Sequence, residues 1–335
     1  MALLLNNMIY YLPLEYIDRR YTVLLDKWMT DEFKKQKKRF VTIQSDMLKQ
    51  EIKTGSFLDS DGTNYFKFGQ LREVCKLFKD GKVKDGDVFW LSDVWFPGIE
   101  AIKYMAYFHK ITVKIKGLLW AGSFTETDFV RGMEDWAKWI EIGWFKMIDT
   151  IFCTSAFQRS ELVEKGRVLD FLRIETIGAP FNYKDYYKIV PYKEWKDKED
   201  LVVFVGRLVD EKMPWVFDRM EKHFRGIYPN VRFIKTMEVT KTKKEYLELL
   251  SRAKVVFSSA LQENFGYAVL EGCAYNCNLV LPNRLAYPEM YPAECLYGSD
   301  EHAVNKIIWA LKRPQNTLRF AKKQRTNVER IVKLV

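Results

Sequence analysis

The stretch LVVFVGRLVDEKMPW (201–215) decides the fold of the second half of this chain. Its first five residues are apolar, which predicts a buried strand, and Pro214 indicates the start of a helix. Arg207 and Lys212 lie in the loop between them. Two cations beside a helix N-terminus suit a diphosphate, because that end of a helix carries partial positive charge. Surface cations paired with the two neighbouring acidic residues are the alternative.

A second loop of this kind follows the apolar stretch KVVFSS (254–259). It reads SSALQENFGYAVLEG (258–272) and places Glu263 and Glu271 eight positions apart, with Gly266 between them. Free backbone amides at a helix start suit an anion or a ligand rich in hydroxyl groups, and a carboxylate one turn further on suits a ribose diol. A helix cap and a surface glutamate are the alternative interpretation.

Apolar, β-rich stretches alternate with helical patterns along the rest of the chain, which is typical of an α/β protein with parallel sheets. Helices are predicted at 21–37 and 65–80, among others. The predicted strands are 8–12, 39–43, 87–91, 111–119, 150–153, 173–177, 201–206, 231–235, 254–259 and 278–282.

Residues 180–200 carry two prolines, many charges and no clean period, so they are predicted to be an interdomain linker. The chain is therefore expected to form two doubly wound, Rossmann-like domains, residues 1–180 and 181–317, facing each other across a cleft. A last helix, 318–335, is expected to pack back on the first domain. Ligands of such folds bind outside the carboxyl ends of the strands, where both loops described above are placed.

Composition excludes several classes of protein. The 335 residues are 48% hydrophobic and 29% charged, as in a soluble globular protein. No window approaches the roughly 18 uninterrupted apolar residues of a membrane span. The apolar start, 1–12, is predicted to be a first strand and not a signal peptide. Five scattered cysteines predict a reducing, cytoplasmic location, with Cys273 and Cys277 as buried small residues and not zinc ligands.

Positive charge is the other compositional signal. Basic residues outnumber acidic ones by 54 to 44, which gives a net charge of +10. Such a field attracts polyanions, nucleic acid first among them. The charge gathers in the run KKQKKR (34–39), in a group between Lys235 and Lys244, and in the tail from Lys312. Solvated surface and an anionic partner are about equally good interpretations of such runs.

The two loops together resemble the nucleotide-sugar half of GT-B glycosyltransferases, in particular glycosyltransferase family four. There, G-R-x4-K is followed by E-x7-E within the pattern E-x-F-G-x4-E. The matching stretches here are VGRLVDEKMP (205–214) and ENFGYAVLEGCAYNCNLVLP (263–282). The resemblance covers residues 201–290, whereas the first half matches only in its alternation of strands and helices. It implies a GT-B fold.

The resemblance also implies roles for single residues. Arg207 and Lys212 would hold the donor diphosphate and stabilise its charge as the glycosidic bond breaks. Glu263 would lie against the hydroxyls of the donor sugar, and Glu271 would bind the ribose. Backbone amides near the helix start would support sugar and phosphate, at Asn264, Phe265 and Gly266.

The reaction implied is transfer of a hexose with retention of configuration, without a metal or a cofactor besides the nucleotide sugar. UDP-glucose, the commonest donor, is the expected one. The chain has only three histidines (His109, His223 and His302), and no metal-ligand cluster of His and Asp is evident in the sequence.

By the same resemblance the first domain binds the acceptor. Arg19 and Arg20 precede a helix in the loop LPLEYIDRRYT (12–22) and are predicted to hold a phosphate. Further candidates come from the loops 92–98 and 117–129. These acceptor-side candidates are Trp95, Trp120 and Ser123.

Many family members have a histidine of the first domain near the donor sugar. This sequence has none on a matching loop, and Trp95 or Trp120 is expected to fill the comparable space. The acid/base residue therefore stays open, with Asp93 and Asp128 as the candidates.

The acceptor is predicted to be DNA. The stretches YLPLEYIDRRYTVLLDKW (11–28) and WAGSFTETDF (120–129) are similar to uncharacterised glycosyltransferase-like proteins of bacteriophages. Phage enzymes of this fold glycosylate hydroxymethylated pyrimidines in DNA, which implies a 5-hydroxymethylpyrimidine acceptor and action in the cytoplasm of an infected cell. Basic grooves and an aromatic or apolar wedge are what extraction of a base from the duplex requires.

Two alternatives belong to other classes. One is a glycosyltransferase for a lipid or polysaccharide at a membrane surface, which an amphipathic helix at 134–148 would favour. The other is a nucleic-acid-binding protein without activity. A binder would have no need of the four donor-site side chains, and this argues against it.

Overall fold

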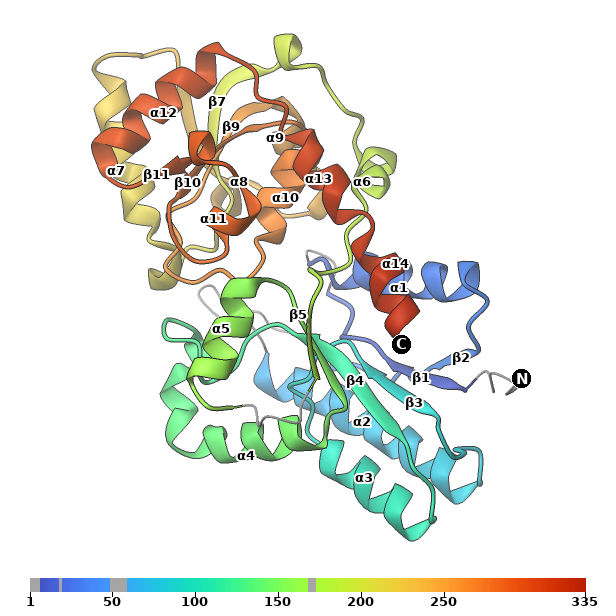
Figure 1. Cartoon of the computed structure of the whole chain (residues 1–335). Helices are drawn as coiled ribbons and strands as arrows, with labels where there is room; N and C mark the ends of the chain where they lie inside the picture. Colours follow the sequence, from blue (N-terminus) through green and yellow to red (C-terminus); the bar gives the residue numbers. More distant parts are fainter. Residues whose placement is uncertain (1–6, 18–19, 49–58, 168–172) are drawn as a thin grey trace. The chain divides into compact units, whose positions relative to one another are not determined.

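The computed structural model describes residues 7–17, 20–48, 59–167 and 173–335. The chain divides into two compact units. The first unit extends to Ala179 and also contains Asn327–Val335; the second contains Pro180–Thr326 together with Tyr21. Each unit is built on one parallel sheet with helices on both faces (Figure 1), which confirms the α/β prediction.

The first unit has a six-stranded sheet in the order β2-β1-β3-β4-β5-β6, and every pairing is parallel. Its strands are β1 (Ile9–Leu12), β2 (Phe40–Thr42), β3 (Val88–Leu91), β4 (Lys114–Leu119), β5 (Thr150–Cys153) and β6 (Arg173–Thr176). Its helices are α1 (Thr22–Lys35), α2 (Ser60–Lys79), α3 (Ile99–Phe108), α4 (Glu134–Met147), α5 (Ala156–Glu164) and α14 (Asn327–Leu334).

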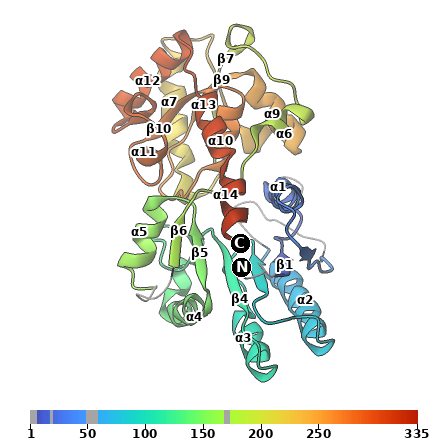
Figure 2. The same ribbon diagram turned by 45° about the vertical axis from the view of Figure 1, so that its right-hand side comes forward.

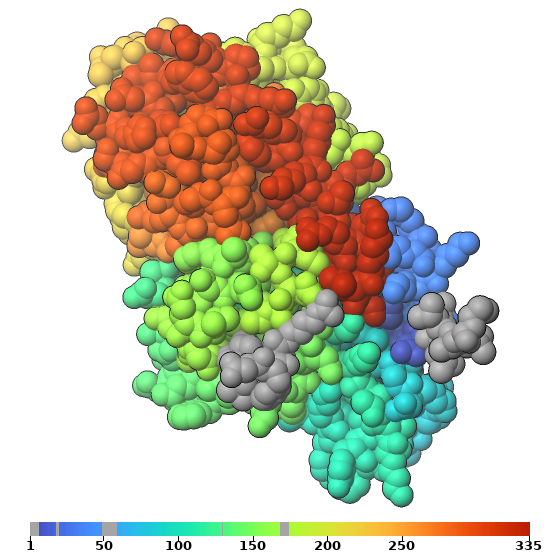
Figure 3. Space-filling view, in the orientation of Figure 1, coloured from blue at the N-terminus to red at the C-terminus, as the bar shows by residue number. Residues whose placement is uncertain are grey.

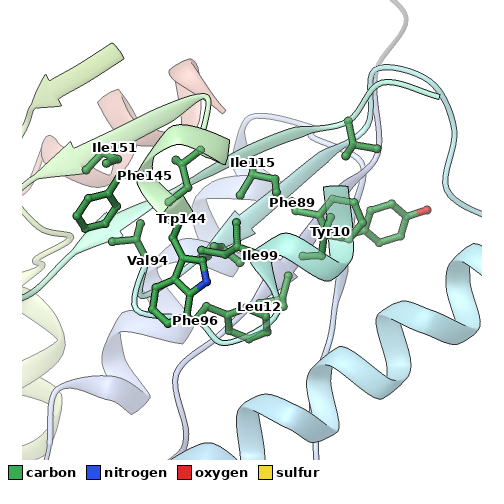
Figure 4. Packing of buried hydrophobic residues seen from close by; sticks show 14 of the residues in the cluster. Tyr10, Leu12, Phe89, Val94, Phe96, Ile99, Ile115, Trp144, Phe145 and Ile151 are labelled. Atoms are coloured by element: carbon green, nitrogen blue, oxygen red, sulfur yellow. The ribbon is translucent and has the colours of Figure 1, made fainter. Parts of the chain in front are cut away.

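Side chains alternate across this sheet and so build two apolar layers. Tyr10 and Phe89 are buried in the larger layer, where Trp144 of α4 also packs (Figure 4). On the other face Tyr11 packs against Phe33 of α1, with ring centroids 5.7 Å apart. Figures 1 and 2 show α2, α3 and α4 together on one face of the sheet, and α1 with α14 on the other.

The helix predicted over 318–335 is interrupted. Its first part, α13 (Leu318–Gln324), belongs to the second unit, and α14 lies against α1 in the first (Figure 3). Asn327, buried at the start of α14, donates from Nδ2 to the backbone oxygen of Ala179 at 3.0 Å. This long-range hydrogen bond ties the start of α14 to the end of the main segment of the first unit.

The second unit has a five-stranded parallel sheet in the order β11-β10-β9-β7-β8. Its strands are β7 (Glu199–Phe204), β8 (Arg232–Lys235), β9 (Ala253–Phe257), β10 (Asn278–Pro282) and β11 (Leu296–Tyr297). Its other helices are α6 (Tyr183–Ile189), α7 (Pro214–Arg225), α8 (Thr236–Val239), α9 (Lys243–Arg252), α10 (Tyr267–Ala274), α11 (Tyr287–Met290) and α12 (Asp300–Lys312).

In both sheets the first strand of the unit lies between the second and the third. The strand order therefore reverses direction between β1 and β3 in the first unit, and between β7 and β9 in the second. Ligands of doubly wound folds bind at this switch point, outside the carboxyl ends of the strands. The chain packs closely there: a Cβ on Gly272 of α10 would come within 2.6 Å of Val256 on β9.

The segment predicted to be an interdomain linker, 180–200, contains a helix that the sequence did not indicate, because residues 183–189 form α6. Asn182 caps this helix by accepting from the backbone N–H of Lys184. Tyr183 and Tyr186, one turn apart, are buried and give the helix an apolar face. The surrounding charges concealed this spacing in the sequence.

The first unit contains a carboxyl group that should make its stability depend on pH. Burial raises the pKa of Glu161, on α5, to about 7; Lys165 opposes this, and three nearby acidic groups (Glu126, Asp128 and Glu164) add to it. The folded state thus holds a proton that the unfolded chain loses near its ordinary value of 4.5. Stability from this group is complete below that value and is lost as pH rises through about 7.

We therefore expect Glu161→Gln to flatten the fall in melting temperature between about pH 4.5 and about pH 7, because the variant has no proton to lose. Thermal unfolding of wild type and variant across this range measures it. Asp135→Asn, at an exposed carboxylate of α4 in the same unit, is the control and should keep the wild-type slope, because Asp135 is not among the groups that shift the pKa of Glu161. Equal slopes for Glu161→Gln and wild type would contradict the assignment.

Candidate functional site

The switch point of the second unit brings together the two loops singled out in the sequence. Arg207 and Lys212 follow β7, and Glu263 follows β9, the strand paired with β7. Because parallel neighbours end at the same edge of a sheet, the loops meet: the Nζ of Lys212 lies 3.5 Å from Oε2 of Glu263. The structure thus joins three of the predicted donor-site residues.

Lys212 is buried, at 8% exposed, on a 3₁₀ turn that precedes α7. Its ammonium donates to the backbone oxygen of Gln262 and lies 3.9 Å from Oε1 of Glu211. Arg207 forms an ion pair with the same Glu211 oxygen. Glu211 therefore contacts both cations, and this carboxylate offsets the repulsion between them.

The β7–α7 loop is fixed to the end of β9. The hydroxyl of Ser259 lies 2.9 Å from the backbone oxygens of Lys212 and Met213, to which it can donate. Arg284 donates to the backbone oxygens of Ser259 at 2.8 Å and of Ala260 at 2.9 Å. These hydrogen bonds hold the cations in place before any ligand binds, which lowers the cost of binding an anion.

Glu263 makes contacts with both of its carboxylate oxygens. Its Oε1 accepts from the backbone N–H of Gly266 at 2.8 Å, at the start of α10, while Oε2 faces Lys212. Gly266 has φ 80°, a left-handed conformation that favours glycine. Asn264 and Phe265 are buried in the same turn, and the ring of Phe265 packs against another aromatic ring. The first predicted glutamate thus binds the N–H of Gly266, the residue before the first turn of α10, and is also a neighbour of the buried lysine.

Glu271, the second predicted glutamate, lies further along α10 in a separate polar cluster. It is 3% exposed, and its Oε1 accepts from the phenol of Tyr186 at 3.0 Å and from the ammonium of Lys243. Burial, and then the nearby Glu271, raise the pKa of Tyr186 well above its ordinary value, so the phenol keeps the proton it donates.

Sequence reasoning did not connect four of these residues with the site. Gln262, Glu211 and Arg284 stand near the predicted motifs, but only the fold shows which of them contact the cations or the loops. Lys243 was visible only as one member of a basic group. A cavity of about 190 Å³ opens beside the loops, and its lining includes Met213, Ser259 and Arg284.

Two candidates lie in the loop after β3 and are held there by contacts within the first unit: Asp93, an acid/base candidate, and Trp95, an acceptor-side candidate. Asp93 accepts from the ammonium of Lys67 at 2.8 Å and from the backbone N–H of Trp95 at 3.1 Å. The ring of Trp95 packs edge-on against Trp144, 5.7 Å between centroids. Asp93 is therefore a carboxylate held in an ion pair with a buried ammonium.

The candidates after β4 are also part of local structure. Trp120 donates from its indole nitrogen to the backbone oxygen of Ser92 at 2.7 Å. Ser123 is fully buried, and both its N–H and its hydroxyl donate to Glu141. Asp128 caps the 3₁₀ turn Phe129–Met133. Ser123 exposes no surface to an acceptor.

Arg19 lies outside the described residues, and its neighbour Arg20 is partly exposed. Within the described ranges, no three or more His, Cys, Asp or Glu side chains come close enough to hold a metal ion. The five cysteines are free, and all except Cys75 are buried. The part of the chain that the structure describes contains no helix with the length and hydropathy to cross a bilayer.

Comparison with known proteins places the fold. No family model matches the sequence. The tRNA-queuosine α-mannosyltransferase of Drosophila melanogaster is 37% identical over 73 residues, which are 22% of this chain and 19% of that protein. The chain thus matches 19% of the length of this curated relative.

Solved structures match over nearly the whole chain. A sucrose-phosphate synthase from Thermosynechococcus elongatus is 12% identical, with a TM-score of 0.62 over 98% of this chain and 96% of its own. A UDP-forming α,α-trehalose-phosphate synthase from Burkholderia vietnamiensis is 11% identical, with a TM-score of 0.64 over 98% of this chain and 99% of its own. At these identities the likeness establishes the fold, which is GT-B.

The left-handed turn at Gly266 should be sensitive to substitution. A Cβ there would make only ordinary contacts, 3.5 Å from Tyr287 and 3.6 Å from Glu263, so the cost is backbone strain. We expect Gly266→Ala to lower the free energy of unfolding by about 1–2 kcal/mol. Urea unfolding measures it, with Gly143→Ala on α4 as the control.

At Gly143 a Cβ meets none of the described atoms within 4 Å, and the backbone is helical. Alanine there should leave stability unchanged or raise it by up to about 1 kcal/mol. If Gly266→Ala unfolded at the wild-type urea concentration, the turn would not impose the strain that its φ indicates.

Proposed function

We propose that this GT-B protein is a metal-independent, retaining glycosyltransferase that moves a hexose from a nucleotide sugar to a hydroxyl group. The observation that carries the proposal is the meeting of Arg207, Lys212 and Glu263 at the switch point of the second unit. This is where doubly wound folds bind nucleotides, and it holds two cations that hydrogen bonds already fix in position.

The two cations would bind the donor diphosphate. A phosphate that enters takes over part of the charge compensation that Glu211 now supplies. When the bond between the sugar carbon and the phosphate oxygen breaks, its electron pair stays on the phosphate. Arg207 and Lys212 stabilise that growing charge, and since they are preorganised they do so without rearrangement.

The two glutamates would recognise the rest of the donor. Glu263 would lie against the sugar hydroxyls, with the backbone amides of Asn264, Phe265 and Gly266 beside it. Glu271 would accept hydrogen bonds from the ribose diol. UDP-glucose is the first donor to test.

For the acceptor we favour a hydroxyl on a modified base of a nucleic acid, a 5-hydroxymethylpyrimidine of phage DNA in the first instance. The net charge of +10 supports a polyanionic partner. The name of the Drosophila relative gives a modified base of tRNA as its acceptor, which supports the same chemical class.

A lipid acceptor is the second candidate, and one observation favours it. Three neighbouring helices carry large exposed apolar side chains on one face of the first unit; we call this the α2–α4 face. Tyr107 is 77% exposed and Trp139 is 67% exposed, with the ammonium of Lys138 5.2 Å from the Trp139 ring. The exposed apolar residues of the α2–α4 face are Tyr65, Phe68, Tyr104, Tyr107, Phe108, Trp136, Trp139 and Ile140. Exposed aromatics beside lysines suit a membrane interface.

A transfer assay tests the main proposal. Protein would be mixed with UDP-glucose or GDP-mannose and with DNA that contains 5-hydroxymethylcytosine, 5-hydroxymethyluracil or no modification, and with tRNA as a further acceptor. Mass spectrometry of the digested nucleosides should show a hexose on one modified base only. Lys212→Ala should lower the rate by about 10²–10³-fold, as expected for loss of one preorganised charge.

Lys222→Ala, an exposed lysine on α7, is the control and should keep full activity. Full activity of Lys212→Ala would contradict the donor site. Release of free nucleotide diphosphate without transfer to nucleic acid would keep the enzyme and move the acceptor to lipid or glycan. No transfer and no release would favour the non-catalytic binder.

The second candidate predicts that the protein sediments with vesicles of phosphatidylcholine and phosphatidylglycerol. Replacing Trp136 and Trp139 by Ser should abolish this, because indole rings contribute most of the interfacial contact. The control is Trp309→Ser, a 37% exposed tryptophan on α12 in the other unit. Vesicle binding that both variants retain would exclude the α2–α4 face, and no binding by the wild type would exclude the lipid surface.

A further inference from the structure

The ammonium of Lys243 contacts the carboxylate that the proposed function assigns to the donor ribose. We infer that Lys243 is a positioning residue: it holds Glu271 in the orientation in which the carboxylate can accept hydrogen bonds from the ribose hydroxyls. The inference rests on the proposed function and adds a determinant of its nucleotide specificity.

Local sequence fixes where Lys243 stands. Thr242 caps α9 by accepting from the backbone N–H of Glu245 at 3.2 Å, and Glu245 accepts from the backbone N–H of Thr242 at 3.2 Å. This capping box makes Lys243 the first residue of the helix. A cation at that end is repelled by the helix dipole, so the position is unfavourable unless an anion lies near. Glu271 is that anion.

The carboxylate in turn requires the lysine. Glu271 is 3% exposed, and an isolated charge so far from water is costly. Lys243 supplies the counter-charge, with its own side chain 15% exposed. Its ammonium also lies 4.8 Å from the ring centroid of Tyr246 and 5.8 Å from that of Tyr186, which limits its movement.

The hydrogen bonds are distributed unevenly over the carboxylate. Within the described residues, the phenol of Tyr186 and the ammonium of Lys243 both donate to Oε1 of Glu271. An ionised carboxylate has about four acceptor positions on its two oxygens. The two donors therefore limit the rotation of the group, and the phenol of Tyr246 lies near the same carboxylate. The acceptor positions that remain are the ones offered to an incoming diol.

A purely structural ion pair is the alternative, since the three residues come from α6, α9 and α10, which pack together. The two roles differ in a measurable way. Loss of a structural contact weakens every nucleotide alike. Loss of a positioning contact weakens only those nucleotides that carry ribose hydroxyls, because only these hydrogen-bond to Glu271.

The test is to measure by calorimetry the binding of UDP and of 2′,3′-dideoxy-UDP. The same measurement is repeated with GDP and 2′,3′-dideoxy-GDP. Wild type should bind the nucleotide with ribose hydroxyls about tenfold more tightly or better, as expected for hydrogen bonds to a charged group. Lys243→Met should lose most of this preference and bind the dideoxy form as wild type does. Glu271→Gln should behave similarly, and Lys243→Arg should restore part of the preference.

Lys244→Met is the matched control, because Lys244 is the next residue of α9, 67% exposed, and pairs only loosely with Glu248 at 3.9 Å. It should bind both nucleotides as wild type does. If Lys243→Met fails to fold in a melting experiment, Tyr186→Phe removes the other donor to Oε1 and should show the same selective loss.

Two results would overturn the inference while the proposed function stands: equal weakening of both nucleotides by Lys243→Met, or no change in either. Failure of the proposed function would instead be seen in the nucleotide binding of the wild-type protein. If wild type binds neither UDP nor GDP, the donor site is wrong, and the role of Lys243 is wrong with it.

Discussion

The pairing of β7 with β9 is the constraint on which the candidate site depends. The two strands carry loops far apart in sequence, and their parallel register places both carboxyl ends at one edge of the sheet. Ser259 then ties the loops together through the backbone oxygens of Lys212 and Met213. Without this pairing Lys212 and Glu263 would be unrelated charges on separate loops.

A basic protein would be expected to collect unbalanced positive charge where it binds an anion. The structure shows the opposite arrangement, since each cation of the site has a carboxylate partner. Arg207 and Lys212 share Glu211, and Lys243 pairs with Glu271. A ligand phosphate therefore exchanges one negative partner for another, which limits the electrostatic cost of the empty site.

The sequence allowed accurate prediction of the features that depend on local pattern. The strands at 150–153 and 278–282 have the predicted ends, because turn residues bound short apolar stretches there. Features that depend on distant partners were not predictable. The burial of Ser123 follows from Glu141, a residue of another element, and the surroundings of Glu271 come from α6 and α9. Charged residues between 180 and 200 hid the tyrosine spacing of α6.

The return of α14 to the first unit has a consequence for synthesis. This unit is not a contiguous segment of chain: its sheet and first helices are made before the second unit, but α14 is made after it. During translation the surface of α1 that α14 covers stays open until α14 has left the ribosome. The second unit can therefore finish folding before the first, which reverses the usual order of domains along a growing chain.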